Sequence, residues 1–253
     1  MKGSIIIGLK ILIFSVFLQV SCTSTSTSVP TTTFNKAAPN CSPATSVSRD
    51  EVIAIAETYR TWQWIPTTSN SFHGFDQKGI RVDTPDHQFK PDNGIRPGWW
   101  KPGQTNVGIP YKWGGFDSPQ SFSEKIKSGK YAGDIYTQQK RQQLNDAVSD
   151  ETCGVDCSGF VSRCWRLAQP YSTRTLPNIC TALPSWDDLK KGDIVNKSND
   201  HVLIFEHWLD ESKTRFMAYE TGCPPTWKVL RHPIQVNYVK GLGYLPYRYN
   251  NIH

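Results

Sequence analysis

A single cysteine, Cys157, stands among small polar residues at the point in the run 154–161 where an apolar helical pattern begins. Apolar residues then recur at the spacing of an α-helix, at Phe160, Val161, Cys164, Trp165 and Ala168. This pattern predicts a helix that begins at or near the cysteine. A helix N-terminus carries partial positive charge and free backbone N–H groups, which stabilise a thiolate and a developing oxyanion. Cys157 is therefore the candidate nucleophile.

A thiol nucleophile needs a base, and the chain contains six histidines. His201 begins an apolar run that is typical of a strand. Residues 210–213 predict a hairpin turn, and residues 215–220 predict the returning strand. Folding the hairpin at this turn brings Glu220 within about one residue of the position opposite His201, where cross-strand side chains lie roughly 5 Å apart. The sequence thus predicts a nucleophile, a base and a residue that orients the base.

Four blocks of the sequence resemble, in the same order, the motifs of the NlpC-type, papain-like cysteine peptidases of bacterial cell walls. The blocks are GIPYKWGG at 108–115, DCSGFV at 156–161, KGDIV at 191–195, and His201-Val202. The resemblance covers about residues 48 to 249. It implies an α+β fold in which the nucleophile helix packs on an antiparallel sheet that carries the histidine.

The resemblance also implies roles for individual residues. The matching positions give Cys157 as nucleophile, His201 as base and Glu220 as the orienting residue on the next strand. The expected substrate-binding or oxyanion residues are Tyr111, Asp156 and Ser158. The first of these matches a family tyrosine that lies beside the nucleophile. The implied substrate is a peptidoglycan stem peptide, cut next to its D-glutamyl residue, and the implied chemistry needs no cofactor and no metal.

Two other classes of function are compatible with the same residues. A non-catalytic envelope lipoprotein would bind wall peptides in the same groove, and an amidase or acyltransferase would use the same cysteine and histidine on another substrate. The set of Cys157, His201 and Glu220 favours an enzyme, because a binding protein needs none of the three. The sequence does not separate a peptide bond from other amides, and it indicates no oligomeric state.

The chain departs from the family pattern at residues 119–152, an insertion of 34 residues between the Trp-Gly-Gly block and the cysteine block. Its charges are balanced, with Lys125, Lys127, Lys130, Lys140 and Arg141 against Glu124, Asp134, Asp146, Asp150 and Glu151. The insertion is either a lid over the cleft or a solvated helical excursion. We favour the excursion, because surface insertions cost little free energy.

Residues 63–107 are irregular and rich in Gly, Pro and Asp, yet they contain several aromatic residues. This mixture predicts an ordered loop, since disordered segments are poor in aromatics. Trp99 and Trp100 either stack on a sugar ring or fasten the loop to the core, and the second interpretation is favoured. His73 and His87 have no partners at metal-site spacing and are expected in surface loops.

The N-terminal region predicts export. Residues 1–22 combine positive charge, an apolar stretch and a small residue before Cys22, as in a signal peptide. The cysteine resembles the lipid-attachment residue of bacterial lipoproteins, which would anchor the protein to a membrane of the cell envelope; the alternative is an ordinary secretory signal. Residues 23–47, rich in Ser, Thr and Pro, are expected to be a tether. The catalytic domain is expected over 48–253, which is long enough for one core.

The expected domain begins with a capping box at residues 48–51, followed by a helix with a buried stripe at Val52, Ile55, Ala56, Tyr59 and Trp62.

Removal of the signal lysines leaves 26 basic and 22 acidic residues, a net charge of +4. The positive residues are scattered and no nucleic-acid motif is present, so nucleic acid is not an expected partner. A modest positive charge suits an enzyme near an anionic wall.

Cysteine usage is compatible with an exported thiol enzyme. Seven cysteines are present. If Cys22 is lipidated or removed and Cys157 stays free, five remain, so at least one is unpaired. A zinc site on Cys153, Cys157 and Cys164 is the alternative, but the spacing matches no common zinc pattern and the metal would consume the nucleophile. Cys164 is expected to be a small core residue.

Overall fold

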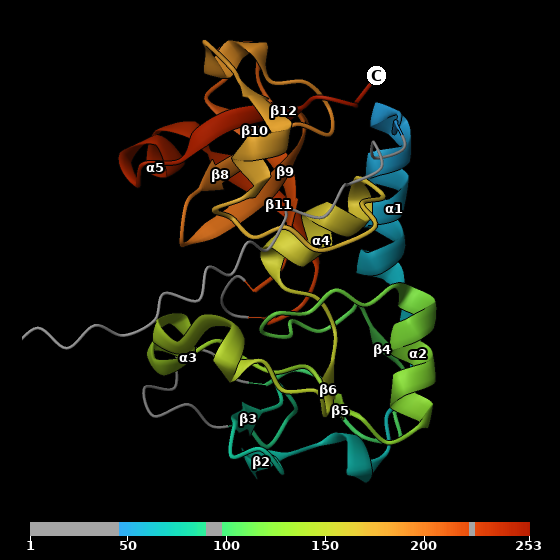
Figure 1. Ribbon diagram of the computed structural model, residues 1–253. Coiled ribbons are helices and arrows are strands. Elements are labelled where there is room, and N and C mark those ends of the chain that lie inside the picture. Colours follow the sequence, from blue (N-terminus) through green and yellow to red (C-terminus); the bar gives the residue numbers. More distant parts are fainter. Residues whose placement is uncertain (1–45, 90–97, 223–225) are drawn as a thin grey trace, which may run out of the picture. The chain divides into compact units, whose positions relative to one another are not determined.

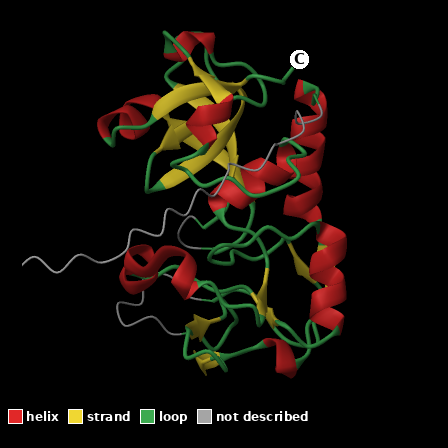
Figure 2. Cartoon of the chain, viewed as in Figure 1, coloured by secondary structure: helices red, strands yellow, loops and turns green. Residues whose placement is uncertain are grey.

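The computed structural model describes residues 46–89, 98–222 and 226–253 (Figure 1). Within these residues the fold is α+β, with helices, a main antiparallel sheet and three small two-stranded sheets, of which the β5–β6 pair is parallel (Figure 2). The helices are α1 (Arg49–Thr61), α2 (Pro119–Lys127), α3 (Gln138–Gln143), α4 (Cys157–Cys164) and α5 (Val236–Gly241). Short 3-10 turns lie at Thr68–Asn70, Leu144–Ala147, Leu176–Ile179 and Trp186–Asp188. The expected α+β class is therefore confirmed, and the papain-like fold stays a prediction.

The main sheet has six strands in the order β11-β10-β9-β8-β12-β7, and all neighbouring pairs are antiparallel. Its strands are β7 (Cys180–Ala182), β8 (Ile194–Lys197), β9 (His201–Trp208), β10 (Arg215–Glu220), β11 (Leu230–Gln235) and β12 (Leu245–Tyr249). Three two-stranded sheets pair β1 (Gln63–Trp64) with β4 (Asn106–Val107), β2 (His73–Phe75) with β3 (Arg81–Asp83), and β5 (Tyr131–Ala132) with β6 (Thr152–Cys153).

Helix α1 begins where its cap was predicted. The Ser48 hydroxyl accepts a hydrogen bond from the backbone N–H of Glu51 at 3.2 Å. The Glu51 carboxylate pairs with Arg166 at 2.8 Å. Three residues of the predicted stripe are buried and two, Ile55 and Trp62, are partly buried; the buried ones are Val52, Ala56 and Tyr59. The helix therefore presents one apolar face to the core.

Helix α4 begins at Cys157 as predicted but is shorter than the apolar pattern suggested. It ends at Cys164, and Ala168 is exposed. The cause is a left-handed residue, Arg166 with φ of 57°, after which the N–H of Leu167 returns to the carbonyl of Ser162 at 2.9 Å. The prediction of a helical stripe up to Ala168 was wrong, because the chain turns back one residue after Trp165.

Helix α4 packs on β9 and against α1, and this packing fixes its first turn beside the start of β9. Phe160 and Val161 are fully buried in the main core cluster together with Val202 and Ile204 of β9. The helix also touches the chain at residue 115, since a Cβ on Gly159 would lie 2.0 Å from the Gly115 carbonyl. The expectation of a nucleophile helix packed on an antiparallel sheet agrees with this arrangement.

The insertion 119–152 is not a solvated excursion. It contains α2, β5, α3 and part of β6, and three of its apolar side chains, Phe122, Ile126 and Ala132, belong to the main core. A buried ion pair between Lys140 and Asp134 fastens α3 to the loop before it. The interpretation as an excursion was wrong because the balanced charges hid an apolar face on α2 and a buried ion pair.

The aromatic loop packs on the core, as predicted. Trp100 is fully buried, and its indole N–H donates to the Ala132 carbonyl at 3.1 Å. Trp99 is partly buried and makes an edge contact with Trp64. His87 lies in an exposed turn, as expected, whereas His73 belongs to strand β2 and bonds two carboxylates. His73 is thus exposed, as expected, but the prediction that it lies in a loop was wrong.

The predicted signal peptide, the tether and Cys22 lie outside the described residues, apart from the last two tether positions. Among the described residues, no helix is both long enough and apolar enough to cross a membrane.

Candidate active site

Cys157 is the first residue of α4, and its side chain is 9% exposed at a cavity wall. The Asp156 carboxylate caps the helix by accepting from the N–H of Gly159 at 2.6 Å. In the described part of the chain, the N–H groups of Cys157 and Ser158 donate to no protein acceptor. Two free donors therefore remain in the helical turn that carries the thiol, as an oxyanion site requires.

His201 is the first residue of β9 and lies opposite Lys197 of β8. Its Nε2 atom bonds the Glu220 carboxylate, and the Cys157 thiol is close enough to influence the charge of the ring. Burial lowers the pKa of His201, but the hydrogen bonds to Cys157 and Glu220 outweigh burial and hold this pKa well above its usual value. The imidazole is thus stabilised in its charged form beside the thiol.

Glu220 is the last residue of β10, and its buried carboxylate bonds two histidines. One oxygen bonds His201 and the other bonds Nε2 of His232 on β11. Burial raises the pKa of Glu220, but the two hydrogen bonds outweigh it and lower this pKa to about 2. Glu220 therefore stays ionised and orients both rings.

The strand register differs from the prediction. Tyr219 lies opposite Ile204, so Glu220 comes opposite Leu203, two residues from His201. We predicted that Glu220 would lie within about one residue of the position opposite His201. It lies two residues from that position, so the prediction was wrong. The carboxylate still reaches His201, because residues two apart along a strand share a face.

His232 is the site residue that the sequence analysis missed. It lies opposite Ala218 on the edge strand β11, whose partly buried and exposed residues alternate. The alternation of residues around Pro233 could have indicated this strand in the sequence. A proline does not argue against a strand at the edge of a sheet, because edge strands tolerate proline. The two other strands of the site carried longer apolar runs and were easier to recognise.

Tyr111 is buried beside the nucleophile. Burial raises the pKa of its phenol, and the nearby Cys157 and Asp156 raise it further. Its ring packs against Gly222 so closely that a Cβ there would lie 2.6 Å from the ring. The phenol therefore stays protonated near the thiol, and its predicted role in binding substrate or an oxyanion remains a prediction.

Asp156 and Ser158 form part of the helix start. Besides capping Gly159, the Asp156 carboxylate accepts from the Ser158 hydroxyl at 3.1 Å, and burial raises the pKa of this carboxyl. Both side chains line the cavity next to Cys157. The structure thus gives them a positioning role, and their contact with substrate remains a prediction.

Two cavities flank the candidate catalytic residues. One, of about 290 Å³, is lined by Cys157, and the other, of about 320 Å³, is lined by His201 and Glu220. Arg141 of α3 and Asp200 border both cavities, so the insertion forms part of the cleft wall. A peptide that crosses the Cys157–His201 pair would therefore contact the insertion.

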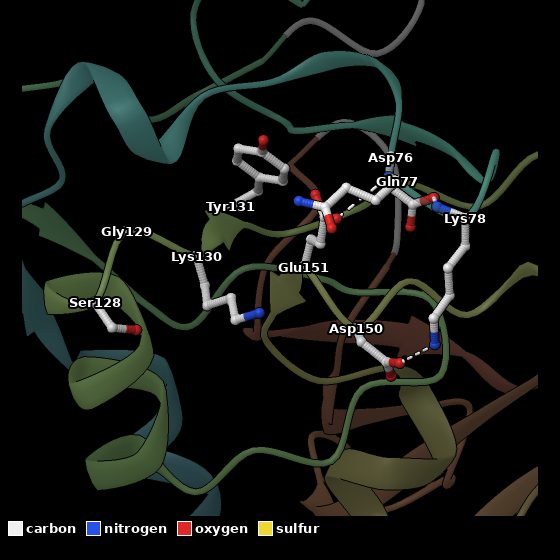
Figure 3. Close-up of a pocket in the computed structure, with 9 residues that line it drawn as sticks. All are labelled: Asp76, Gln77, Lys78, Ser128, Gly129, Lys130, Tyr131, Asp150 and Glu151. Carbon is white, nitrogen blue, oxygen red and sulfur yellow. Dashed lines mark hydrogen bonds and ion pairs between the residues drawn. The ribbon is translucent and has the colours of Figure 1, made fainter.

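A larger cavity of about 420 Å³ has different chemistry (Figure 3). Figure 3 shows Lys78 paired with Asp150, and the side chain of Glu151 bonded to the backbone of Gln77. No cysteine or histidine lines it. This cavity therefore offers no thiol nucleophile and no imidazole base.

The cysteines proposed for a zinc site are not gathered together. The Cys153 thiol donates to the Tyr131 carbonyl at 3.4 Å, and Cys164 is buried within α4. Across the described residues, no group of three or more His, Cys, Asp or Glu side chains is arranged to hold a metal. Four cysteines in this part of the chain are free, including Cys180; Cys41 and Cys223 lie outside it.

The chain was compared with protein-family models, curated proteins and solved structures, and none of them matches it.

Proposed function

We propose that the protein is a cysteine hydrolase of amide bonds. The observation that carries this proposal is the connected series of Cys157 at a helix N-terminus, His201 beside it and Glu220 behind His201. A binding protein has no need for an ionised carboxylate that orients an imidazole next to a thiol and stabilises the imidazolium formed when the thiol loses its proton.

In the first step, His201 takes the proton of the Cys157 thiol, and the thiolate attacks the amide carbonyl carbon. The carbonyl oxygen becomes an oxyanion, for which the N–H groups of Cys157 and Ser158 are the available donors. His201 then gives its proton to the leaving nitrogen as the C–N bond breaks. An acyl thioester and a free amine result.

In the second step, His201 removes a proton from water, and the resulting hydroxide attacks the thioester carbonyl. The C–S bond breaks, a carboxylic acid leaves, and the Cys157 thiol regains its proton. Glu220 stays ionised throughout, since its pKa of about 2 lies far below that of its partner ring. Its role is to orient the imidazole and to stabilise the imidazolium.

The order of the motifs and the packing of α4 on an antiparallel sheet support a papain-like fold of the NlpC type. By that resemblance, the proposed substrate is a peptidoglycan stem peptide. An acyltransferase would use the same thioester with an amine in place of water. Analysis of the products separates the two reactions.

The test is digestion of purified peptidoglycan by the wild type and by Cys157→Ala, followed by mass analysis of the soluble fragments. We expect new amino and carboxyl termini within the stem peptide from the wild type alone. Iodoacetamide should alkylate Cys157 faster than the buried Cys164. Identical fragments from Cys157→Ala would refute the proposal.

We further propose that Cys22 carries a lipid and anchors the enzyme in the cell envelope. The wild type should then fractionate with membranes, and Cys22→Ala should be released or left unprocessed. A stable hold needs at least two membrane-binding signals, because one acyl chain binds only marginally. Recovery of a soluble wild type with an unmodified N-terminus would support simple secretion instead.

A further inference from the structure

The cavity beside His201 has a mainly apolar lining. Two of its side chains, Leu203 of β9 and Ile234 of β11, come from the main sheet, and Tyr238 comes from α5. Leu242, directly after this helix, lies in the lining as well. The volume of about 320 Å³ is near the lower end for ligand pockets, which span roughly 300 to 1,000 Å³. The cavity therefore has the size for a small part of a peptide.

Helix α5 fixes one wall of this cavity through two buried valines. Val236 and Val239 belong to the same core cluster as Leu203. Tyr238 is nevertheless 66% exposed, and Leu242 is 42% exposed. Two apolar side chains thus stand in water on a backbone that is held in place. Covering them with an apolar group is favourable, because it removes their surface from water.

The charged side chains of this cavity are paired with one another. Arg141 donates to Asp200 at 2.9 Å. The Glu220 carboxylate bonds both His201 and His232. A charged group that enters the cavity would lose hydration without gaining a free counter-charge. The cavity therefore favours an apolar occupant over an acid or an ammonium group.

The amine part of the substrate is the part that faces this cavity. Cys157 lines the neighbouring cavity and becomes bonded to the acyl carbon. His201 protonates the leaving nitrogen, so this nitrogen lies on the His201 side of the thiol. The residue whose amino group leaves can therefore place its side chain between the sheet and α5.

We propose that the cavity beside His201 binds a large apolar side chain of the residue whose amino group leaves, with Tyr238 and Leu242 as specificity-determining residues. The direction of the substrate rests on the proposed hydrolase function; the apolar site itself rests on the lining of the cavity. A leucine side chain fits this chemistry, whereas a lysine side chain has to leave its ammonium group outside.

The test uses three peptides, alanyl-γ-D-glutamyl-leucine amide and the same peptide with alanine or lysine in place of leucine. Their binding to the full chain carrying Cys157→Ala is measured by calorimetry. We expect the leucine peptide to bind about 10- to 100-fold more tightly than the alanine peptide, because it buries several more methylene and methyl groups. The lysine peptide should bind more weakly than the leucine peptide, since its ammonium group finds no free counter-charge.

Leu242→Ala in this background should lower the leucine-to-alanine ratio by about 3- to 10-fold, and Tyr238→Ala should lower it as well. The matched control is Leu245→Ala, which removes a leucine that is 55% exposed on β12 and lies outside the lining. It should leave the ratio unchanged. Thermal unfolding of each variant shows that the fold is retained.

Three results would overturn the inference. The first is equal binding of the leucine and alanine peptides, or no binding of any peptide. The second is tighter binding of the lysine peptide than of the leucine peptide. The third is a leucine-to-alanine ratio that stays unchanged in both Leu242→Ala and Tyr238→Ala.

Hydrolysis of the same peptides by the wild type separates this inference from the proposed function. Cleavage of all three at equal kcat/KM through Cys157 would preserve the hydrolase and reject the apolar site. Tighter binding of the leucine peptide that depends on Leu242, without any cleavage, would preserve the site and reject the hydrolase.

Discussion

Glu220 reaches His201 because a bulge in β9 puts the two side chains on one face of the sheet. Near the hairpin, Phe216 lies opposite Trp208, and this register would place Glu220 opposite Ile204, on the face away from His201. The register shifts between Met217 and Ala218, so that Glu220 lies opposite position 203 instead. One extra residue in β9 therefore brings the carboxylate to the imidazole.

Replacing Cys157 tests the nucleophile. Cys157→Ser should abolish hydrolysis and leave the melting temperature nearly unchanged, because the hydroxyl is close in size but a far weaker nucleophile. Cys164→Ala, at a fully buried position of the same helix, should lower stability by about 1 kcal/mol and keep most activity. Kinetics and thermal denaturation check both. Full activity in Cys157→Ser would exclude the mechanism.

Replacing His201 tests the base. His201→Ala should lower kcat/KM by about 100- to 10,000-fold, the usual contribution of a general base. The matched control is His207→Ala, six residues further along β9, on an exposed side chain. At roughly 3.3 Å per residue the two lie about 20 Å apart, so one cysteine cannot use both. A silent His201→Ala with a damaging His207→Ala would identify the other histidine as the base.

Replacing Glu220 tests the charge behind the base. The carboxylate raises the pKa of His201, so Glu220→Gln should lower it. The alkaline limb of kcat/KM, where the imidazolium loses its proton, should then move to lower pH. The rate loss should be smaller than in His201→Ala, because the Gln amide oxygen still accepts from Nε2–H. The measurement compares the pH–rate profiles of the wild type and Glu220→Gln. An alkaline limb at the same pH in both would mean that Glu220 does not raise the pKa of His201.

The positions of Cys157 and His201 could be predicted because short sequence patterns around each residue indicate the start of its helix or strand. A cap followed by helical spacing marks the start of α4, and an apolar run marks β9. The offset of Glu220 depends on where the hairpin closes and on one bulge, for which the sequence has no clear local signal. The burial of the insertion depends on tertiary contacts of α2, such as Phe122 in the main core. Local patterns do not specify such contacts.

His232 holds the second oxygen of Glu220, and His232→Gln tests this positioning role. The histidine helps to keep the pKa of Glu220 at about 2, so its loss should raise that pKa and move the acid limb of kcat/KM to higher pH. Stability should fall by about 1–3 kcal/mol, as for a lost hydrogen bond to a buried charge. His207→Gln serves as the control on an exposed histidine. A loss of stability without any change in the acid limb would leave His232 with a merely structural role.

His73 should make stability depend on pH away from the active site. Hydrogen bonds to Asp83 and Asp86 outweigh burial and raise the pKa of His73 to about 9, from an ordinary value of 6.5. A raised pKa means that the stabilisation is complete below about pH 6.5 and is lost as the pH rises through 9. His73→Gln should therefore be less stable than the wild type at pH 6, by about 1 kcal/mol or less given the partial exposure, and equally stable at pH 10. Thermal unfolding between pH 6 and 10 measures the difference, with His87→Gln as the control on a neighbouring exposed turn. A difference that stays constant over this range would show that the charge of His73 contributes nothing.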